Sequence, residues 1–473
     1  MKYLPIAAAF LSLAAAPAFG EEAAPPFNDA QIKTANKLVD KALEDDTAYD
    51  FVEGLTTEIG PRLAASGDEA RARDWAVAKL KKLGFKNVRI ETFEMPYWGR
   101  LEEKAAIVSP YPQPLTITAL GGSPSTPADG LSGEVVRFET FQALKAAPMT
   151  GLEGKIVFVD EKMTRTQDGS GYGVAVMKRA LSAQEAAKRG AVAALIRSAG
   201  TDSHRNPHTG GMRHQQGVPV VPAAALANPD ADQLARALAH AKGTVTVSLN
   251  IQVETKEKAT SGNVIAEIPG KTDDLVVVGG HLDSWDLGTG AIDDGAGVAI
   301  AAAAAKLVGD LPGKPQRTIR VVFFGAEEPG LLGAQAYVKA HEGELARHAF
   351  AAESDFGSGR IWKFDTNVAE SALPKTAAIV DVLRRIGVAP GSNDSGGGSD
   401  VSALKDAGVP VAELVQNGWD YFDLHHTPDD TLDKVDPGDL KQNVAAYAAT
   451  IYLVSEMKGG LRDETKAAGA AAN

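Results

Sequence analysis

Hydrophobic residues recur at helical spacing in two stretches near the start of the chain. From Asn28 to Leu43, and again from Gly67 to Leu83, they fall three or four positions apart. Residues at that spacing lie on one face of a helix, so each stretch is predicted to be an amphipathic helix. Gly84 follows the second stretch, where a glycine cap commonly ends a helix. The alternation from Val88 to Phe93 then predicts a strand.

Prolines and glycines break the pattern between Ser109 and Gly133, and we predict a domain boundary within this stretch. Short apolar runs and helical stretches follow as far as Lys256, and a self-contained segment of this size is typical of an inserted domain. Its strands are predicted at residues 133–138, 155–160, 191–196 and 218–224, and its helices at residues 182–189 and 230–241.

From Asn263 to Met457 the chain alternates nearly continuous apolar runs with helical stretches. Such alternation is typical of an α/β fold whose parallel strands are covered by helices on both faces. The expected fold is a mainly parallel mixed sheet flanked by helices, with an inserted α+β domain. Strands are predicted at residues 264–268, 275–279, 318–324 and 348–352, and helices at residues 294–308 and 331–340. The predicted division is residues 21–110 and 257–458 for the core, 111–256 for the inserted domain with its linkers, and 459–473 for a disordered tail.

Residues 1–20 are predicted to be a secretory signal peptide. Lys2 provides a short positive region, an apolar stretch follows, and Ala16-Pro17-Ala18 supplies small residues. The stretch is too short to span a bilayer comfortably and no stop-transfer segment follows, so no stable membrane span is expected. We expect export to the periplasm or the extracellular medium, with cleavage after Ala18 or Gly20. The alternative is a cytosolic protein with an apolar N-terminus.

The composition narrows the range of functions. The formal charge of −13 argues against nucleic acid as a partner, because proteins that bind phosphate backbones need a basic surface. The chain of 473 residues contains no cysteine, so neither a disulfide nor a thiol contributes to the fold or the chemistry. A chain of this length builds a sufficient core without such cross-links.

Acidic and imidazole side chains follow four of the apolar runs. His281 ends one run, Glu327-Glu328 and Glu353-Ser354-Asp355 follow two others, and His425-His426 come after the run at Val409–Ala412. Ligands of open α/β sheets bind beyond the carboxyl ends of strands, so these groups are expected to meet at one edge. Taken singly, His281 or Asp355 at a strand end would have a structural role more often than not.

Clustered carboxylates and imidazoles require a neutralising cation, and a ligand set of His, Asp and Glu suits zinc. Two ions about 3.5–4 Å apart would share the five candidate ligands if one carboxylate bridged them. Asp293-Asp294, twelve residues after His281, is the expected source of that bridge. Asp294 has a second interpretation as the N-terminal cap of the following helix.

Three other catalytic motifs are incomplete. His341-Glu342 lacks the second histidine of the H-E-x-x-H zinc motif, because Leu345 occupies that position. Gly169-Ser170-Gly171 lacks the G-x-S-x-G spacing of a serine nucleophile. No G-x-G-x-x-G follows a predicted strand, which leaves a dinucleotide site without support.

Several of these segments resemble, in the same order, the metal-binding segments of the M28 family of co-catalytic zinc peptidases. They are His281–Gly295, Glu327-Glu328, Glu353–Asp355 and His425–Thr431. Residues 186–198 and 207–210 also resemble the protease-associated domain found in that family. The resemblance implies two Zn²⁺ per chain, with one ion on His281 and Asp355, the other on Glu328 and His426, and Asp293 bridging them. It also implies that Glu327 is the general base.

The same resemblance suggests roles for neighbouring residues. Asp283 and Asp294 are expected to support the ligands. Asp283 lies two residues after His281, so alternation along an extended strand places both side chains on the same side and allows Asp283 to orient the imidazole. A cis peptide is implied between Asp293 and Asp294. Three residues are placed in loops near the substrate, although a structural role is equally open for them: Tyr421, Ser399 and Asp400. For three histidines of the inserted segment, packing is favoured over metal binding: His204, His208 and His214.

The implied activity is hydrolysis of dipeptides or short peptides with free termini by an exopeptidase of the dipeptidase or carboxypeptidase kind. An aminopeptidase that releases N-terminal residues is the alternative, and the sequence leaves open which terminus is recognised. A metal-free receptor-like binding protein would have broken ligand positions. A glutaminyl-cyclase-type acyltransferase would use one zinc and lack the inserted domain. A homodimer is compatible with the resemblance.

Overall fold

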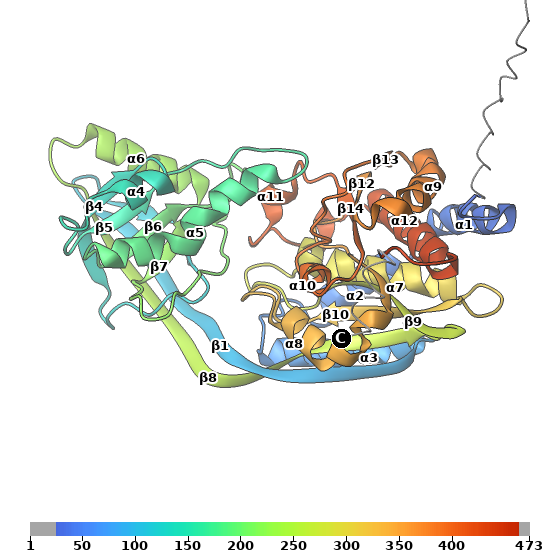
Figure 1. Cartoon of the computed structure of the whole chain (residues 1–473). Coiled ribbons are helices and arrows are strands. Elements are labelled where there is room, and N and C mark those ends of the chain that lie inside the picture. The colour runs from blue at the N-terminus through green and yellow to red at the C-terminus, as the bar shows by residue number, and fades with distance from the viewer. Residues whose placement is uncertain (1–24, 463–473) are drawn as a thin grey trace, which may run out of the picture.

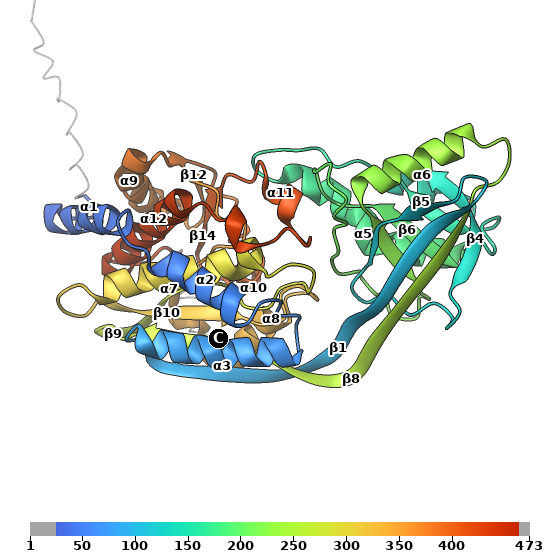
Figure 2. The same cartoon turned by 180° about the vertical axis from the view of Figure 1, so that it is seen from behind.

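The computed structural model describes residues 25–462, which form two lobes joined by a pair of long strands (Figures 1 and 2). The larger lobe contains both ends of the described chain, and the smaller lobe lies between the two long strands in sequence. The predicted signal peptide, and residues 463–473 of the predicted tail, lie outside the described residues.

A sheet runs through the larger lobe. Its strands are β8 (Thr246–Ile268), β9 (Thr272–His281), β10 (Arg317–Phe324), β11 (His348–Glu353), β12 (Ile361–Asn367), β13 (Ala389–Pro390) and β14 (Val411–Gln416). The four strands β14, β11, β9 and β10 are adjacent in this order and parallel to one another. β12 and β8 flank them in antiparallel orientation. The prediction of a mainly parallel mixed sheet is confirmed.

Helices cover both faces of this sheet. One face packs against α1 (Asp29–Ala42), α2 (Thr47–Glu58), α3 (Gly67–Lys82), α7 (Ala296–Gly309), α9 (Leu373–Leu383) and α12 (Pro437–Glu456). The other face packs against α8 (Leu332–Ala340) and α10 (Val401–Asp406). Side chains alternate between the faces of a strand, so along β9 Val276 and Val278 contact the first set, whereas Leu275 and Val277 contact the second.

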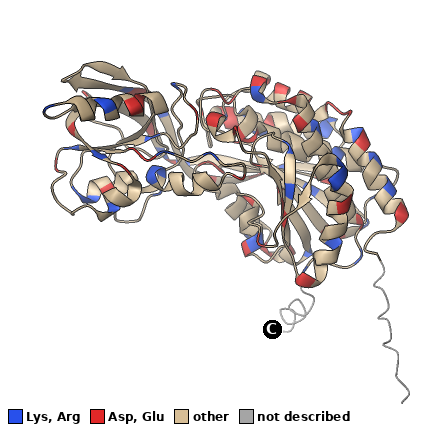
Figure 3. Cartoon of the chain, turned by 90° about the horizontal axis from the view of Figure 1, so that it is seen from above, with Lys and Arg blue, Asp and Glu red and all other residues tan. Residues whose placement is uncertain are grey.

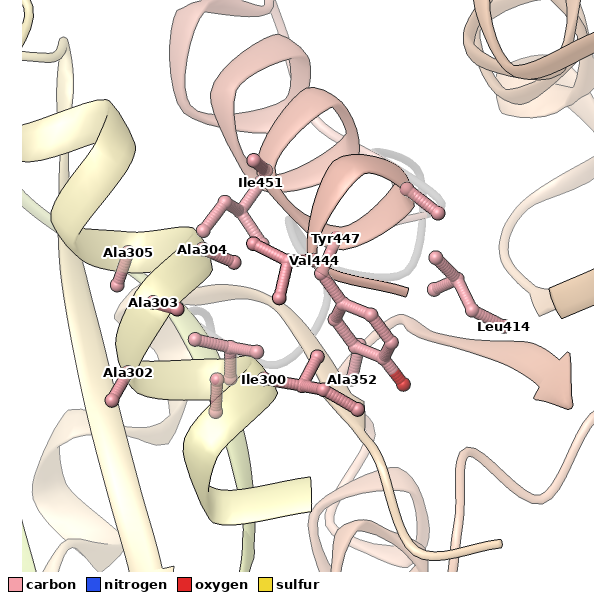
Figure 4. Close-up of a cluster of buried hydrophobic side chains, with 14 of the residues drawn as sticks. Ile300, Ala302, Ala303, Ala304, Ala305, Ala352, Leu414, Val444, Tyr447 and Ile451 are labelled. Atoms are coloured by element: carbon pink, nitrogen blue, oxygen red, sulfur yellow. The ribbon is translucent and has the colours of Figure 1, made fainter. Parts of the chain in front are cut away.

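α7 is a buried helix that packs against both the sheet and α12 (Figure 4). Its run of alanines, Ala302–Ala305, allows a close approach of the neighbouring helix, while Ile300, Val444 and Tyr447 fill the remaining space. Because α7 begins directly after the Asp293-Asp294 pair, this packing fixes the position of both carboxylates.

β1 (Lys86–Ser109) and β8 form a long antiparallel ribbon between the lobes. They pair from Lys86 opposite Glu267 to Ser109 opposite Thr246. In the larger lobe β8 pairs with β10, and at its other end it pairs with β4 (Leu131–Phe138) of the smaller lobe. The predicted boundary at residue 256 therefore lies inside β8, and β1 extends well beyond the strand predicted at residues 88–93.

The smaller lobe is built on a second sheet. Its remaining elements are β2 (Gln113–Leu115), β3 (Ile117–Ala119), α4 (Phe141–Ala146), β5 (Ile156–Val159), α5 (Ser170–Lys188), β6 (Ala193–Arg197), β7 (Ala223–Leu226) and α6 (Asn228–His240). The strand order is β4-β5-β6-β7-β3, with β3 alone antiparallel to its neighbour within this run. Apolar side chains pack on both faces of the sheet and give this lobe hydrophobic cores of its own.

Two sequence predictions need correction. α5 begins at Ser170, well before the predicted start at residue 182, because buried contacts of Ala175 and Lys178 hold turns that contain two glycines. The predicted tail begins too early, because Leu461 is buried in the main core and its carbonyl accepts the Ala369 N–H at 2.9 Å.

Lysines and arginines are interspersed with acidic residues on the outer helices of the larger lobe (Figure 3). Pairs such as Arg385–Asp40 and Lys441–Asp46 link neighbouring helices there. Within residues 25–462, none of the helices combines the length and the apolar character needed to cross a bilayer.

Lys178 of α5 is fully buried and donates to the carbonyl of Glu161 at 2.6 Å. Burial lowers its pKa to about 7. Between pH 7 and about 10 the unfolded chain therefore carries a proton that the folded chain lacks, so stability rises with pH across that window. Lys178→Met is expected to remove this pH dependence, which is on the order of 3 kcal/mol.

Urea unfolding at pH 7 and pH 9.5 measures the effect. The gain of Lys178→Met over wild type should be larger at pH 7 than at pH 9.5. Lys242→Met, at an exposed position of the same lobe, serves as the control and should change neither midpoint. An equal change at both pH values for Lys178→Met would contradict the prediction.

Candidate metal centre

Three parallel strands carry acidic or imidazole side chains to one edge of the sheet. His281 ends β9, Glu327 and Glu328 follow β10, and Asp355 follows β11. β9 lies between β10 and β11, so their carboxyl ends meet. The convergence predicted from the sequence is confirmed for these groups.

Asp293 lies between two sets of nitrogen and oxygen atoms. Its Oδ1 is 3.2 Å from His281 Nε2, which lies 3.3 Å from Asp355 Oδ1. Its Oδ2 is 3.2 Å from His426 Nε2, which lies 3.0 Å from Glu328 Oε2. The structure therefore gathers all five predicted ligands around one shared carboxylate.

His425 is a further imidazole beside this cluster. Its ring stacks on that of His426 with the centroids 3.5 Å apart, and its Nε2 is 3.7 Å from Asp293 Oδ2. His426 lies closer to Asp293 and also reaches Glu328. The geometry favours His426 as the ligand, in agreement with the choice made from the sequence.

The cluster draws protons onto its imidazoles. Burial opposes the charge on His426, but Glu328 and Asp293 outweigh it and raise the pKa of His426 to about 9. In the same way Asp355 and Asp293 overcome burial and raise the pKa of His281 well above its usual range. Burial, with Asp355 and Glu328 adding to it, raises the pKa of Glu327 well above its usual range. The site favours positive charge.

The contact predicted between the Asp283 side chain and His281 is made by the Asp283 backbone instead. His281 Nδ1 lies 2.8 Å from the Asp283 carbonyl oxygen, whereas the carboxylate is 3.8 Å away. β9 ends at His281, so the alternation on which the prediction relied does not extend to Asp283. The Asp283 carboxylate accepts the N–H groups of Glu327 at 3.0 Å and Glu328 at 3.3 Å. It thereby fixes the backbone that presents these two side chains.

Asp294 fulfils both interpretations offered by the sequence. Its Oδ1 accepts the N–H of Gly297, in the first turn of α7, at 3.0 Å. Its Oδ2 accepts the N–H of His281 at 3.0 Å. The peptide bond between Asp293 and Asp294 is cis, as the resemblance implies. Asp294 therefore links the strand-end histidine to the start of α7.

Arg62 holds the segment between His281 and Asp293 through hydrogen bonds to its backbone. This role was not predicted from the sequence. The side chain is fully buried. Its guanidinium donates to three carbonyl oxygens of that segment, which belong to Leu282 at 2.6 Å, Thr289 at 2.7 Å and Gly290 at 2.9 Å. Because these partners lie more than 200 residues later in the chain, no local pattern could mark Arg62.

Asp430 supports the shared carboxylate and was also missed. It accepts the N–H of Ile292 at 2.6 Å and the N–H of Asp293 at 3.3 Å. Its position within the His425–Thr431 motif is a signal that could have identified it.

A cleft of about 620 Å³ lies over the cluster, and Ser399 and Tyr421 line it, as expected of residues near a substrate. Asp400 does not meet that expectation, because it is fully buried beneath the cleft. It directly precedes α10, which packs on the sheet, so its side chain is enclosed beside Glu353. Burial and the Glu353 carboxylate raise the pKa of Asp400 well above its usual range.

The smaller lobe forms one wall of the same cleft. Seven of its residues line the cleft, among them Tyr172 and Arg179 of α5, and Met212 and Arg213 of the loop before β7. None of these was identified from the sequence, because α5 was predicted to start too late and the loop has no periodic pattern.

Backbone contacts join the smaller lobe to the loop that carries His426. This loop follows the short helix α11 (Tyr421–Leu424). The backbone carbonyl of His426 accepts the Thr209 N–H at 3.0 Å. His208 Nδ1 lies 2.8 Å from the His425 carbonyl oxygen, and its Nε2 lies 2.7 Å from Asp202 Oδ1. His208 therefore has the packing role that the sequence favoured. The other two histidines, His204 and His214, are exposed.

Known proteins share these features. Residues 263–451 match the model of Peptidase family M28. Carboxypeptidase Q of Bos taurus is 34% identical over 413 residues, 87% of this chain and 86% of that protein. The solved structure of a Peptidase M28 precursor from Shewanella amazonensis SB2B is 52% identical, with a TM-score of 0.90, and the match covers 92% of this chain and 99% of that one. Aminopeptidase YwaD of Bacillus subtilis (strain 168) is 25% identical over 422 residues, 86% of this chain and 84% of that protein.

The chain belongs to peptidase family M28. The resemblance seen in the sequence is confirmed, and the protein is a metallopeptidase. The segment His281–Trp285 predicts carboxypeptidase Q as its relative within the M28 family. The comparison agrees, because carboxypeptidase Q is more similar to this chain than Aminopeptidase YwaD is.

The side chains of this M28 site fit a pair of divalent cations. Asp293 Oδ2 and Glu328 Oε1 are buried, and neither has a hydrogen-bond partner within the described part of the chain. Two groups of potential ligands each converge within 4.8 Å, namely His281 with Asp293 and Asp355, and Asp293 with His425 and His426. Asp293 belongs to both groups, as a bridging ligand must. Imidazole nitrogens and carboxylate oxygens together suit zinc.

Asp283→Asn is expected to weaken binding of Zn²⁺ by this M28 peptidase by about 10- to 100-fold. An amide offers a single acceptor oxygen, so one of the two N–H groups now held by Asp283 loses its partner. Competition with a chromogenic chelator measures the affinity, and thermal unfolding reports whether the fold is intact. Asp310→Asn, beyond the far end of α7, is the matched control. Unchanged affinity in Asp283→Asn would contradict the assigned role.

Proposed function

We propose that this M28 peptidase is an exopeptidase with two zinc ions per chain, which hydrolyses dipeptides or short peptides with free termini. The observation that carries the proposal is Asp293, whose two oxygens face His281 on one side and His426 on the other. Asp355 would complete the first ion's ligands and Glu328 the second's.

Glu327 is assigned as the general base. It lines the cleft beside Glu328, and Asp283 holds the backbone of both. When bound, zinc would act as a Lewis acid toward the scissile carbonyl and would lower the pKa of water to near neutral. Glu327 accepts the proton of the attacking water and returns it to the departing amine.

Similarity to carboxypeptidase Q supports a dipeptidase or carboxypeptidase activity, with an aminopeptidase as the second candidate. A receptor-like binding protein would have broken ligand positions, whereas all five ligands and Glu327 lie together here. An acyltransferase of the glutaminyl-cyclase type would lack the segment that supplies one wall of this cleft.

Three further assignments belong to the proposal. Residues 111–256 are an inserted protease-associated domain, which the separate hydrophobic cores of the smaller lobe support. Residues 1–20 are a signal peptide, and the protein is exported to the periplasm or the medium, which the order of charge, apolar stretch and small residues supports. The homodimer stays a prediction.

Glu327→Gln is expected to retain two zinc ions per chain and to lower kcat for dipeptide hydrolysis by at least about 100-fold. Glutamine preserves the size and polarity of the side chain but cannot accept the proton. Metal analysis of the purified mature protein and hydrolysis of Ala-Leu at pH 7.5 measure the two quantities. Treatment with a chelator should abolish wild-type activity, and added Zn²⁺ should restore it.

Glu342→Gln, at an exposed position outside the cleft, is the matched control and should behave as wild type. A zinc-loaded wild-type protein that cleaves neither dipeptides nor aminoacyl substrates would favour the binding-protein or acyltransferase alternative. Failure to bind zinc under metal-replete conditions would contradict the ligand assignment itself.

A further inference from the structure

Arg179 of α5 is a cation in the cleft without an acidic partner. Its Nη1 donates to the hydroxyl of Tyr172 at 2.5 Å. Its Nε is buried and has no hydrogen-bond partner, and within residues 25–462 no carboxylate lies within ion-pair distance of the guanidinium. Nη1 is also 3.3 Å from His426 Nδ1, but that nitrogen faces the Thr209 carbonyl at 3.1 Å. An imidazole that binds a metal through Nε2 donates from Nδ1, so His426 does not neutralise Arg179.

Arg179 as a whole is half-buried, and the two buried arginines of the smaller lobe are both paired with acids. Arg197 contacts Asp160 at 2.6 Å and Asp232 at 2.7 Å, and Arg189 contacts Glu185 at 2.7 Å. Withdrawing a charge from water without a counter-charge is costly, so an unpaired guanidinium is expected only where a ligand completes it. Because Arg179 lines the cleft over the metal centre, that ligand is an anionic group of the substrate.

The surroundings leave room for such a group. A β-carbon at Gly210 would lie 2.3 Å from Arg179 Nη1, so only glycine at this position admits the guanidinium as it stands. Burial raises the pKa of Tyr172 to about 12, so the phenol keeps its proton and is able to donate it. Guanidinium and phenol together offer several donors, and the planar fork of a guanidinium matches the two oxygens of a carboxylate.

The position of Arg179 relative to the ligands indicates which carboxylate is bound. His426 presents Nε2 to Glu328 and its opposite nitrogen, Nδ1, to Arg179, so one imidazole ring separates the guanidinium from the cluster. The α-carbons on the two sides of a scissile peptide bond are about 3.8 Å apart, and in a dipeptide the second of them carries the terminal carboxylate.

The charges lining the cleft fit a zwitterionic substrate. The wall formed by the smaller lobe contains two cations, Arg179 and Arg213, and one acid, Asp168, whereas the larger lobe adds several carboxylates, among them Glu413 of β14. A dipeptide carries a carboxylate at one end and an ammonium group at the other, so this distribution favours one orientation.

We propose that Arg179, together with the Tyr172 hydroxyl, binds the C-terminal carboxylate of the substrate one residue beyond the scissile bond. The inference rests on the proposed function and deepens it, because it makes a free C-terminus the recognised feature. Dipeptides and carboxypeptidase substrates are then favoured over the longer or blocked peptides that an aminopeptidase accepts.

Binding to the zinc-loaded, full-length mature protein carrying Glu327→Gln tests this directly, because binding is measured without turnover. Titration calorimetry compares Ala-Leu, Ala-Leu-amide and Ala-Glu-amide, of which the last carries a carboxylate only on its side chain. A second substitution in that protein, Arg179→Gln, is expected to weaken the binding of Ala-Leu by about 10- to 100-fold, the range for a hydrogen bond to a charged group. Both amides should bind weakly, and Arg179→Gln should change their affinities less than twofold. The affinity of Arg179→Lys for Ala-Leu should lie between those of Arg179 and Arg179→Gln, because an ammonium keeps the charge but lacks the planar pair of donors.

Arg236→Gln, at an exposed position of α6 outside the cleft, is the matched control and should leave all three affinities unchanged. Equal weakening of Ala-Leu and its amide would overturn the inference, since Arg179 would then only support His426. Tight, Arg179-dependent binding of Ala-Glu-amide would also overturn it, because a side-chain carboxylate would be the ligand. If Arg179→Gln does not fold, the same comparison is made with Arg179→Lys.

The two proposals fail separately. A wild-type protein that hydrolyses Ala-Leu and Ala-Leu-amide equally well would keep the proposed function and overturn the inference. Arg179-dependent binding of Ala-Leu without any hydrolysis by the wild type would keep the inference and overturn the proposed function. Absence of Ala-Leu binding would overturn the inference, and hydrolysis by the wild type would decide the function independently.

Discussion

Concentrated negative charge, withdrawn from water, is the constraint on which the rest of this structure depends. Asp293, Asp355, Glu327 and Glu328 lie together beyond the ends of parallel strands, and their mutual repulsion is relieved only by positive charge among them. Such a cluster must also be held rigidly, because ligands displaced by a fraction of an ångström no longer share their ions. The support comes largely from hydrogen bonds that the side chains of Arg62, Asp283 and Asp430 make to backbone groups, which fix the chain around the ligands.

The smaller lobe completes what the sheet of the larger lobe begins. The strands deliver His281, the acidic pairs and Asp355, but the loop that carries His426 is held from the other side by Thr209 and His208. The same lobe supplies Arg179, so the segment that contacts the His426 loop also contributes a cation to the cleft. With the roles proposed above, metal binding and substrate recognition would be linked through one interface between the lobes.

Much of the chemistry of the site could be predicted from the sequence because several key groups lie at the end of an apolar strand or just after it. Nearness along the chain becomes nearness in space at the edge of a parallel sheet, which is why His281 and Asp355 were found. The rest depends on contacts between distant residues. Arg62 reaches carbonyls more than 200 residues later, and the direction of the Asp283 carboxylate depends on where β9 ends. α12 was missed because it is buried almost all round and lacks the polar face on which helical periodicity relies.

The ribbon of β1 and β8 has a consequence for how this architecture came about. Gly99 and Glu254 face each other across it, and paired strands lie about 5 Å apart, so the chain enters and leaves the smaller lobe at neighbouring points. A tight turn at that level would close the larger lobe into an ordinary hairpin and leave its sheet unchanged. This is the topology that insertion of a segment into one hairpin would produce. Such an insertion would add a wall to the cleft without altering the strand ends that present His281 and Asp355.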